Sequence, residues 1–418
     1  TLSANAIDST ITSTNANTMT VNVAGNNAAT VVDISGAPNV DRVNVTGTPN
    51  VTLKVSLVAI DGLGTATTGT TADDNLLTVI KGNSGTTDIW IKTTGGDADF
   101  SSAIVSSIIV GAALTSTDDL TVASGALIVN AFDQTSDLDI IAKNSSGTSN
   151  TVSIAVKDNA AASVVGNLAG GIKLTTFATA TLTNNDANGQ ATLGPVTALG
   201  TNFTIAAGTQ GFTQVANSAI NLNTGNLTVT GSGAVNLGND VTAAAVLGSS
   251  AYGAITLGLK GLDFVGNVTT GLGNDVLSIY SAVRNSSASY TLATGAGTDS
   301  LTVSISQPFS WNAGADYDSL KFDVDVDLSG KVVTLTSVDE ILLDSGSAGA
   351  KTVIINPTTF ASNNVFNLRG NSAGADVLIV QGLDASETIN ANQVAVDPNY
   401  AALRLNGGIG NDTITGSS

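Results

Sequence analysis

Turns of Asn, Asp and Gly recur along the whole chain, each followed by a short run in which Leu or Val alternates with a polar residue. The pattern is visible in DDLTVASG (Asp118 to Gly125), GNLTVTGSG (Gly225 to Gly233) and DVLIVQG (Asp376 to Gly382). Alternation of period two buries one face of a β-strand. Apolar residues at helical spacing are nearly absent, and Thr, Val, Ile, Asn and Gly are poor helix formers. The sequence therefore predicts an all-β fold.

The intervals between these strand and turn units are irregular, so no strict repeat length spans the chain. Degenerate repeats of this kind build either a β-solenoid, whose coils bury their apolar faces against one another, or a series of β-sandwiches. We expect an elongated body of three β-rich regions, 1–95, 96–265 and 266–418. The last region is predicted to form β-solenoid or β-roll coils, whereas sandwich and solenoid both remain open for the first two.

The charge balance limits the classes of partner. The 33 acidic and 14 basic residues give a formal net charge of -19, which repels a nucleic-acid backbone. The chain has no Cys and no His, so thiolate and imidazole ligands are excluded. A bound metal must therefore use oxygen ligands, and carboxylates with backbone carbonyls favour calcium.

The longest mainly apolar run, Ala103 to Leu114, is too short to span a bilayer and is interrupted by two serines. We interpret it as a buried strand and predict that the protein is not transmembrane. The chain begins at Thr1, and its first residues lack the basic start and apolar stretch of a signal peptide. This start indicates a processed or truncated product.

The segment Gly407 to Thr415, GGIGNDTIT, matches every position of the pattern G-G-x-G-x-D-x-U-x. Glycines permit positive φ, so the backbone can curl and direct carbonyl oxygens inward. We predict that Gly407, Gly408 and Gly410 supply carbonyls and turn geometry, and that Asp412 supplies a carboxylate to Ca²⁺.

Partial matches to the same pattern occur upstream, with Thr in place of the first glycine in two of them. Asp275 and Asp299 lie 24 residues apart, a spacing that fits one solenoid coil and would stack their two turns around a shared ion. The predicted calcium ligands in these partial turns are Gly271, Gly273, Asp275, Gly295, Gly297, Asp299, Gly374 and Asp376. The alternative is an ordinary set of β-turns, in which Gly, Asn and Asp are the commonest residues.

A different acidic feature is KFDVDVDLSG, Lys321 to Gly330. Its alternation predicts a strand with Asp323, Asp325 and Asp327 in a row on one sheet face. Like charges at this spacing repel unless water or a cation separates them. The row is therefore either a solvated face or a further calcium or subunit-contact site.

The sequence shows little sign of an active site. A Ser-His-Asp triad is impossible without His, and only Trp90 and Trp311 are available as tryptophan platforms for a sugar substrate. We therefore expect that the protein is not an enzyme.

The glycine-aspartate turns are similar to those of the repeats-in-toxin (RTX) family of secreted calcium-binding proteins. With its acidic composition, rich in Thr, Ser, Gly, Asn, Ala and Val, the whole chain resembles a Gram-negative surface-layer protein of that type. The resemblance implies type I secretion, folding outside the cell in calcium, and a two-dimensional lattice on the cell surface held to lipopolysaccharide or another glycan.

Three functions remain as hypotheses. The first is an extracellular structural protein that self-assembles with calcium into a surface layer. The second is part of an RTX adhesin or a filament subunit, which would bind a glycan or surface and form no lattice. The third, a β-helix enzyme, requires a deep groove with clustered carboxylates, and no such catalytic set is apparent in the sequence.

Overall fold

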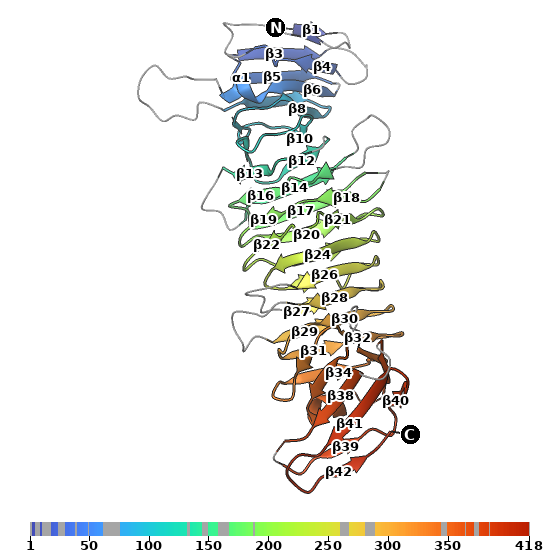
Figure 1. Ribbon diagram of the computed structural model, residues 1–418. Helices are drawn as coiled ribbons and strands as arrows, with labels where there is room; N and C mark the ends of the chain where they lie inside the picture. Colours follow the sequence, from blue (N-terminus) through green and yellow to red (C-terminus); the bar gives the residue numbers. More distant parts are fainter. Residues whose placement is uncertain are drawn as a thin grey trace, which may run out of the picture. The chain divides into compact units, whose positions relative to one another are not determined.

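The computed structural model describes residues 2–4, 9–10, 18–23, 30–37, 40–48, 50–61, 76–131, 134–143, 149–157, 167–186, 189–259, 267–280, 289–343, 349–363, 365–371, 376–383 and 385–417. It divides into two units, Thr1–Val215 (unit 1) and Ala216–Ser418 (unit 2). Figure 1 shows that strands dominate both units. The three regions drawn from sequence composition stay a prediction, and neither of their limits falls at residue 215.

Unit 1 is a parallel β-solenoid, in which each strand pairs with the strand one coil away (Figure 1). One column of stacked strands contains β2 (Ser9–Thr10), β4 (Thr30–Asp33), β6 (Val51–Ser56), β8 (Thr87–Thr93), β10 (Ser107–Val110), β12 (Ala126–Asn130), β14 (Thr151–Val156), β17 (Thr179–Asn184) and β20 (Asn202–Ala206). The others contain β1 (Leu2–Ala4), β3 (Thr18–Val23), β5 (Arg42–Gly47) and β7 (Thr78–Asn83); β9 (Ala98–Asp99), β11 (Asp119–Val122), β13 (Leu138–Ala142), β16 (Ile172–Thr175) and β19 (Val196–Thr197); and β15 (Asn167–Leu168), β18 (Ala191–Leu193) and β21 (Phe212–Gln214). A short helix, α1 (Leu57–Asp61), follows β6.

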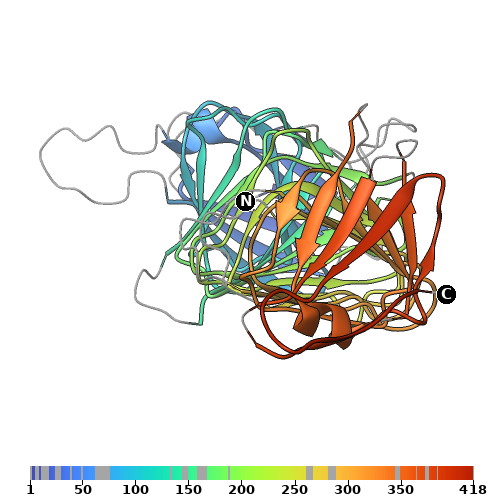
Figure 2. The same ribbon diagram turned by 60° about the horizontal axis from the view of Figure 1, so that its bottom comes forward.

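Unit 2 is a parallel β-solenoid as well. Its first two columns contain β23 (Leu227–Thr230), β25 (Val246–Leu247), β27 (Asn267–Thr269), β29 (Tyr290–Ala293), β31 (Phe309–Asn312) and β34 (Val333–Thr336); and β22 (Ile220–Asn221), β24 (Val235–Thr242), β26 (Ile255–Leu259), β28 (Val276–Ile279), β30 (Ser300–Val303), β32 (Ser319–Phe322), β35 (Glu340–Leu343), β37 (Asn367–Gly370) and β40 (Ala395–Val396). The remaining strands are β33 (Val326–Asp327), β36 (Thr352–Ile355), β38 (Asp376–Gln381) and β41 (Ala401–Asn406); and β39 (Thr388–Asn390) with β42 (Thr413–Thr415). The helix α2 (Pro357–Ser362) packs against β34 and β39. It is the orange-brown helix in Figure 2.

These pairings confirm the predicted all-β solenoid. They also decide the alternative left open for residues 1–265, because the strands there are joined by the same parallel ladders and do not form sandwiches of antiparallel sheets.

The core of each unit consists of apolar side chains stacked in register from coil to coil. In unit 2, one such row runs through Leu277, Leu301, Leu320, Ile341 and Leu368, all of them buried. Neighbouring strands lie about 4.8 Å apart, so each side chain in the row packs directly on the next. Small aliphatic residues suit this layered core, because each coil has a thin interior.

The acidic run at Lys321 to Gly330 is not a single strand, and that prediction is wrong. β32 ends at Phe322 and β33 begins at Val326, so the three residues between them turn a corner of the coil. Phe322 and Val326 are both buried, whereas Val324 is 39% exposed. The period-two pattern continues through the corner, and for this reason the sequence does not reveal the break.

Close packing of successive turns makes Gly314 a sensitive position. Its φ of +105° lies in the left-handed region, and a Cβ there would be 1.8 Å from the carbonyl oxygen of Gly295. We expect Gly314→Ala to lower the free energy of unfolding of unit 2 by roughly 1–3 kcal/mol. Urea unfolding measures the change. Gly330→Ala is the matched control, since a Cβ there meets nothing within 4 Å, and equal losses for both variants would contradict the packing argument.

Candidate functional site

Four aspartates on successive coils of unit 2 form what we name the aspartate column: Asp275, Asp299, Asp318 and Asp339. Each directly precedes a strand of the same ladder, namely β28, β30, β32 and β35. The strands pair in register, because Val276 lies opposite Ser300, which lies opposite Ser319. The register therefore stacks the four aspartates, although their spacings in sequence are 24, 19 and 21 residues.

Each carboxylate of the column accepts a hydrogen bond from the backbone of the preceding coil. Asp275 Oδ1 accepts from the Ile255 N–H at 2.7 Å, and Asp299 Oδ1 accepts from the Asp275 N–H at 2.8 Å. Asp318 Oδ1 accepts from the Asp299 N–H at 2.8 Å, and Asp339 Oδ2 accepts from the Asp318 N–H at 2.9 Å. The column thus ties five coils together where the strands begin.

The second oxygens of three of these carboxylates have no such donor. Asp275, Asp299 and Asp318 are at most 1% exposed, and their Oδ2 atoms make no hydrogen bond within the described part of the chain. Burial raises the pKa of Asp275 to about 6 and that of Asp318 to about 7, and it raises the pKa of Asp299 as well. Neighbouring carboxylates add to the rise, because like charges disfavour ionisation.

Threonine replaces the first glycine of the predicted pattern in two of these turns. The Thr270 hydroxyl donates to the carbonyl oxygen of Thr294 at 3.1 Å, and the Thr294 hydroxyl donates to that of Ala313 at 2.7 Å. The Thr270 hydroxyl and the Gly271 N–H lower the pKa of Asp275, and the Thr294 hydroxyl lowers that of Asp299, but burial raises both pKa values by more. These groups lie near the carboxylates, yet none of them makes a hydrogen bond to the Oδ2 atom of Asp275 or Asp299. Both threonines therefore fasten one coil to the next.

Two of the four glycine carbonyls predicted to bind calcium in these turns accept backbone hydrogen bonds. The Gly271 carbonyl oxygen accepts from the Ala296 N–H at 3.2 Å, and the Gly295 carbonyl oxygen accepts from the Ala315 N–H at 2.9 Å. The backbones at Gly273 and Gly297 also pack closely, since a Cβ on Gly297 would lie 2.5 Å from the Gly273 carbonyl oxygen. These glycines allow the turns to stack directly.

A third turn of the same kind follows at Gly314 to Asp318, and sequence analysis did not identify it as a ligand turn. Asp316 occupies the position of Gly297 and has a φ of +78°, a conformation that glycine adopts more readily. Its Oδ2 accepts from the Gly297 N–H at 3.2 Å. The signal in the sequence is AGADYD, which keeps the first glycine and the last Asp of TGAGTD.

Asp376 lies in a different column, at the start of β38. The predicted turn residue Gly374 falls outside the described residues. Asp376 is buried, and its two carboxylate oxygens accept from the Lys351 N–H at 2.7 Å and the Asn371 N–H at 2.9 Å. The structure therefore does not bring Asp376 together with Asp275 and Asp299.

The terminal turn shows the backbone conformation that its sequence predicts. Gly408 and Gly410 have φ values of +78° and +148°, and a Cβ on Gly407 would lie 2.5 Å from Asp412 Oδ2. Asp412 Oδ1 accepts from the Glu387 N–H at 2.9 Å. The terminal turn thus repeats the contact made in the aspartate column, in a part of unit 2 that is less buried.

Glu387 is an acid that sequence analysis missed. It precedes β39, whose Thr388 lies opposite Thr413, so Glu387 and Asp412 occupy equivalent positions on adjacent coils. The Leu383 N–H donates to Glu387 Oε1 at 3.1 Å, and Oε2 is buried without a partner among the described residues. Its turn, QGLDASET, keeps only one glycine of the pattern, and Glu replaces the final Asp.

Asp323, Asp325 and Asp327 are separated by the corner and have different partners. Asp323 accepts from the Ser304 hydroxyl at 2.6 Å, and Asp325 accepts from the Thr352 N–H at 2.7 Å. Asp327 accepts from the Ser329 hydroxyl and N–H, and these bonds lower its pKa. The three side chains do not form one cluster.

Neither a protein-family model, nor a curated protein, nor a solved structure matches this chain. Its own geometry must therefore support any function. In the part of the chain that the structure describes, no three acidic side chains are grouped closely enough to hold a metal by themselves. No helix within the same ranges is long and apolar enough to cross a membrane.

The negative charge of the site residues suits a bound cation, but the number of oxygen atoms free to act as ligands is small. Three buried carboxylate oxygens of the aspartate column lack a donor, and oxygen is the ligand that calcium prefers. Calcium takes 6–8 oxygen ligands, however, and the Gly271 and Gly295 carbonyls already accept backbone hydrogen bonds. An ion at these turns must therefore be held first by the carboxylates.

Proposed function

We propose that the chain is an extracellular structural protein of the RTX surface-layer type, which self-assembles with calcium into a two-dimensional layer on a bacterial cell. The aspartate column supports this proposal most directly. It places three unpartnered carboxylate oxygens in the interior of unit 2, in a chain whose net charge is already -19. A cation that binds only the folded state would offset this repulsion and favour folding.

Two adjacent carboxylates of the column, Asp299 with either Asp275 or Asp318, would hold such an ion, and Asp412 with Glu387 would hold one at the terminal turn. Calcium would supply positive charge where burial disfavours ionised carboxylates. A secreted chain would then fold where calcium is abundant, outside the cell. This coupling of folding to location supports the proposed secretion and surface placement.

The outer surface of unit 2 supports self-assembly. Several large apolar side chains there are more than half exposed: Tyr252, Leu272, Val332 and Val365. The chain is also rich in Thr, Ser and Asn, whose side chains form hydrogen bonds without charge repulsion. Apolar contacts within a polar surround are typical of contacts between protein copies, and repeated identical contacts generate symmetric assemblies.

Electron microscopy of the purified full chain tests the proposal. We expect ordered sheets in millimolar calcium, their loss on chelation, and no sheets in magnesium at the same ionic strength, because magnesium rarely accepts irregular all-protein cages. Single particles in every condition would contradict the surface-layer proposal. That result would favour the alternative, part of an adhesin or a filament subunit that binds a glycan or surface.

A further inference from the structure

A groove of about 340 Å³ lies on the outer face of unit 1, over the strands β4, β6 and β8. The residues that line it are Val31, Thr52, Lys54, Trp90 and Lys92. Its volume is at the lower end of the range for small-ligand sites, which are clefts of about 300–1,000 Å³. It combines one aromatic ring with two cations in a chain that has only 14 basic residues.

The indole of Trp90 is held in place by the neighbouring coil. A Cβ on Gly111 would lie 2.2 Å from the Cε2 and Nε1 atoms of Trp90, so the ring rests where only glycine leaves room. Trp90 is partly exposed and contributes to the groove lining. Its Nε1–H has no partner within the described ranges, so the ring offers both an apolar surface and a free donor.

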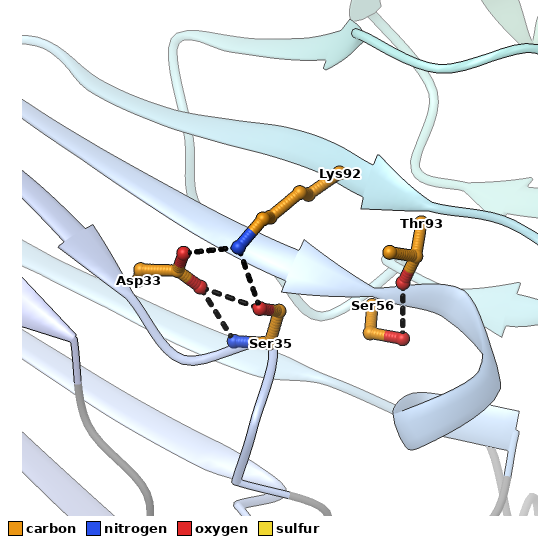
Figure 3. Close-up of polar contacts among 5 residues, drawn as sticks. All are labelled: Asp33, Ser35, Ser56, Lys92 and Thr93. Atoms are coloured by element: carbon orange, nitrogen blue, oxygen red, sulfur yellow. Dashed lines mark hydrogen bonds and ion pairs between the residues drawn. The ribbon is translucent and has the colours of Figure 1, made fainter.

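The cations of the groove are only half neutralised. Lys92 Nζ pairs with Asp33 Oδ2 at 2.6 Å, and Asp33 Oδ1 accepts from the Ser35 N–H and hydroxyl at 3.0 and 2.6 Å (Figure 3). Burial opposes the ionisation of Asp33, but the bonds from Lys92 and Ser35 prevail and lower its pKa. Asp33 therefore stays charged and holds Lys92 at the groove.

Lys54 is the second cation. The strand register places it directly between Asp33 on β4 and Trp90 on β8. Its ammonium group makes no hydrogen bond or ion pair with any residue that the structure describes. The Lys54 ammonium is thus the unpaired charge of the groove lining, beside the aromatic ring. Asp88, opposite Thr52 on the same face of β8, accepts from the Ser107 hydroxyl at 2.8 Å.

We propose that this groove binds an acidic sugar ring, with the apolar face of the pyranose on Trp90 and its carboxylate on Lys54. A sugar ring has an apolar C–H face that packs on an aromatic ring, and its hydroxyls require polar partners such as Thr52 and Asp33. One carboxylate matches the one unpaired ammonium, whereas a polyphosphate would be repelled by the net charge of -19. Sugar binding by the groove does not depend on the proposed function. Only its role, the anchoring of the protein to a surface glycan, rests on that function.

Tryptophan fluorescence of the full chain, titrated in chelator, tests the proposal. The probes are a hyaluronan tetrasaccharide, which contains glucuronate, and neutral chitotetraose. Trp311 is only 1% exposed, so a change in emission reports on Trp90. We expect a saturable change with the acidic probe and at least roughly tenfold weaker binding of the neutral one, because the charge-assisted contact is lost.

Variants separate the groove from the rest of the surface. Lys54→Gln should weaken binding of the acidic probe roughly tenfold to a hundredfold. Trp90→Thr, which keeps a good strand former, should abolish binding as measured by calorimetry. Lys81→Gln is the matched control, since Lys81 lies on β7 in another column and donates to the Asn83 carbonyl oxygen. Far-ultraviolet circular dichroism checks that each variant is folded.

Three outcomes would overturn the proposal: no saturable change with the acidic probe, equal affinity for the neutral probe, or equal loss in the Lys54 and Lys81 variants. The titration requires no lattice. Binding by a protein that forms no sheets would therefore count against the surface-layer proposal alone. Sheets formed by a protein that binds neither probe would count against the sugar groove alone.

Discussion

In buffer free of divalent cations, the free energy of unfolding of unit 2 will fall by several kcal/mol as the pH rises from about 4 to about 8. The pKa values of Asp318 and Asp275 are about 7 and about 6, and that of Asp299 is raised, whereas an unfolded Asp titrates near 3.9. The folded state therefore binds these protons more tightly than the unfolded state. Its extra stability is complete below pH 4 and is lost as the pH rises through 7, at roughly 1.4 kcal/mol for each unit of raised pKa.

Because of the composition of the chain, few groups change their charge between pH 5 and 8. The chain contains no His, and ordinary carboxyls titrate below pH 5, so the α-amino group is the only ordinary group that titrates between pH 5 and 8. General repulsion among surface carboxylates is therefore nearly constant in that range. A fall in stability there must come from carboxyl groups with raised pKa values, and among the described residues of unit 2 these are Asp275, Asp299 and Asp318.

Urea unfolding of a Trp90→Phe full chain provides the measurement. Trp311 is then the only tryptophan, and it reports on unit 2 because its Nε1 donates to Thr294 Oγ1 at 3.3 Å, beside the column. Unchanged or rising stability between pH 5 and 8 would show that the column aspartates are not protonated in the folded state.

The class of fold was predictable from local pattern, but the way its strands pair was not. Period-two alternation identifies strands such as Asp376–Gln381. The same alternation occurs in β-sandwiches and in β-solenoids, so it does not distinguish the two folds. Parallel pairing is decided by contacts between residues about one coil apart, and coil length varies along this chain. The same limit explains the run at Lys321 to Gly330, where alternation continued through a corner.

The candidate site was predicted in part. The spacing of Asp275 and Asp299 suggested stacked turns, and the structure places these two aspartates on adjacent coils. Asp318 and Glu387 were missed as turn acids because Asp316 replaced a glycine in one turn and Glu replaced the final Asp in the other. Backbone register aligns these acids even where the motif has degenerated, and register is not visible in a single sequence. Calcium binding itself stays a prediction.

Replacing Asp318 by Asn should stabilise unit 2 by a few kcal/mol at pH 8 without calcium, and by much less at pH 5. The amide keeps the oxygen that accepts the Asp299 N–H and removes a buried charge. Its NH₂ group must find an acceptor in place of the unpartnered Oδ2, which reduces the gain by about 1–3 kcal/mol if none is near. Urea unfolding at both pH values measures the difference, with Asp327→Asn as control, because Asp327 is exposed and has a lowered pKa.

Calcium separates the two ways in which the column can be neutralised. If the ion binds there, millimolar calcium at pH 8 should stabilise the unsubstituted chain by RT ln(1 + [Ca²⁺]/Kd), about 2.7 kcal/mol at a hundredfold excess over Kd. The Asp318→Asn variant should gain much less, since it has lost a ligand charge. An equal gain in both proteins would place the calcium elsewhere, with the terminal turn at Asp412 and Glu387 as the next position to test. No gain in either would leave protons as the only means of neutralising the column, and calcium-dependent folding of unit 2 would then be wrong.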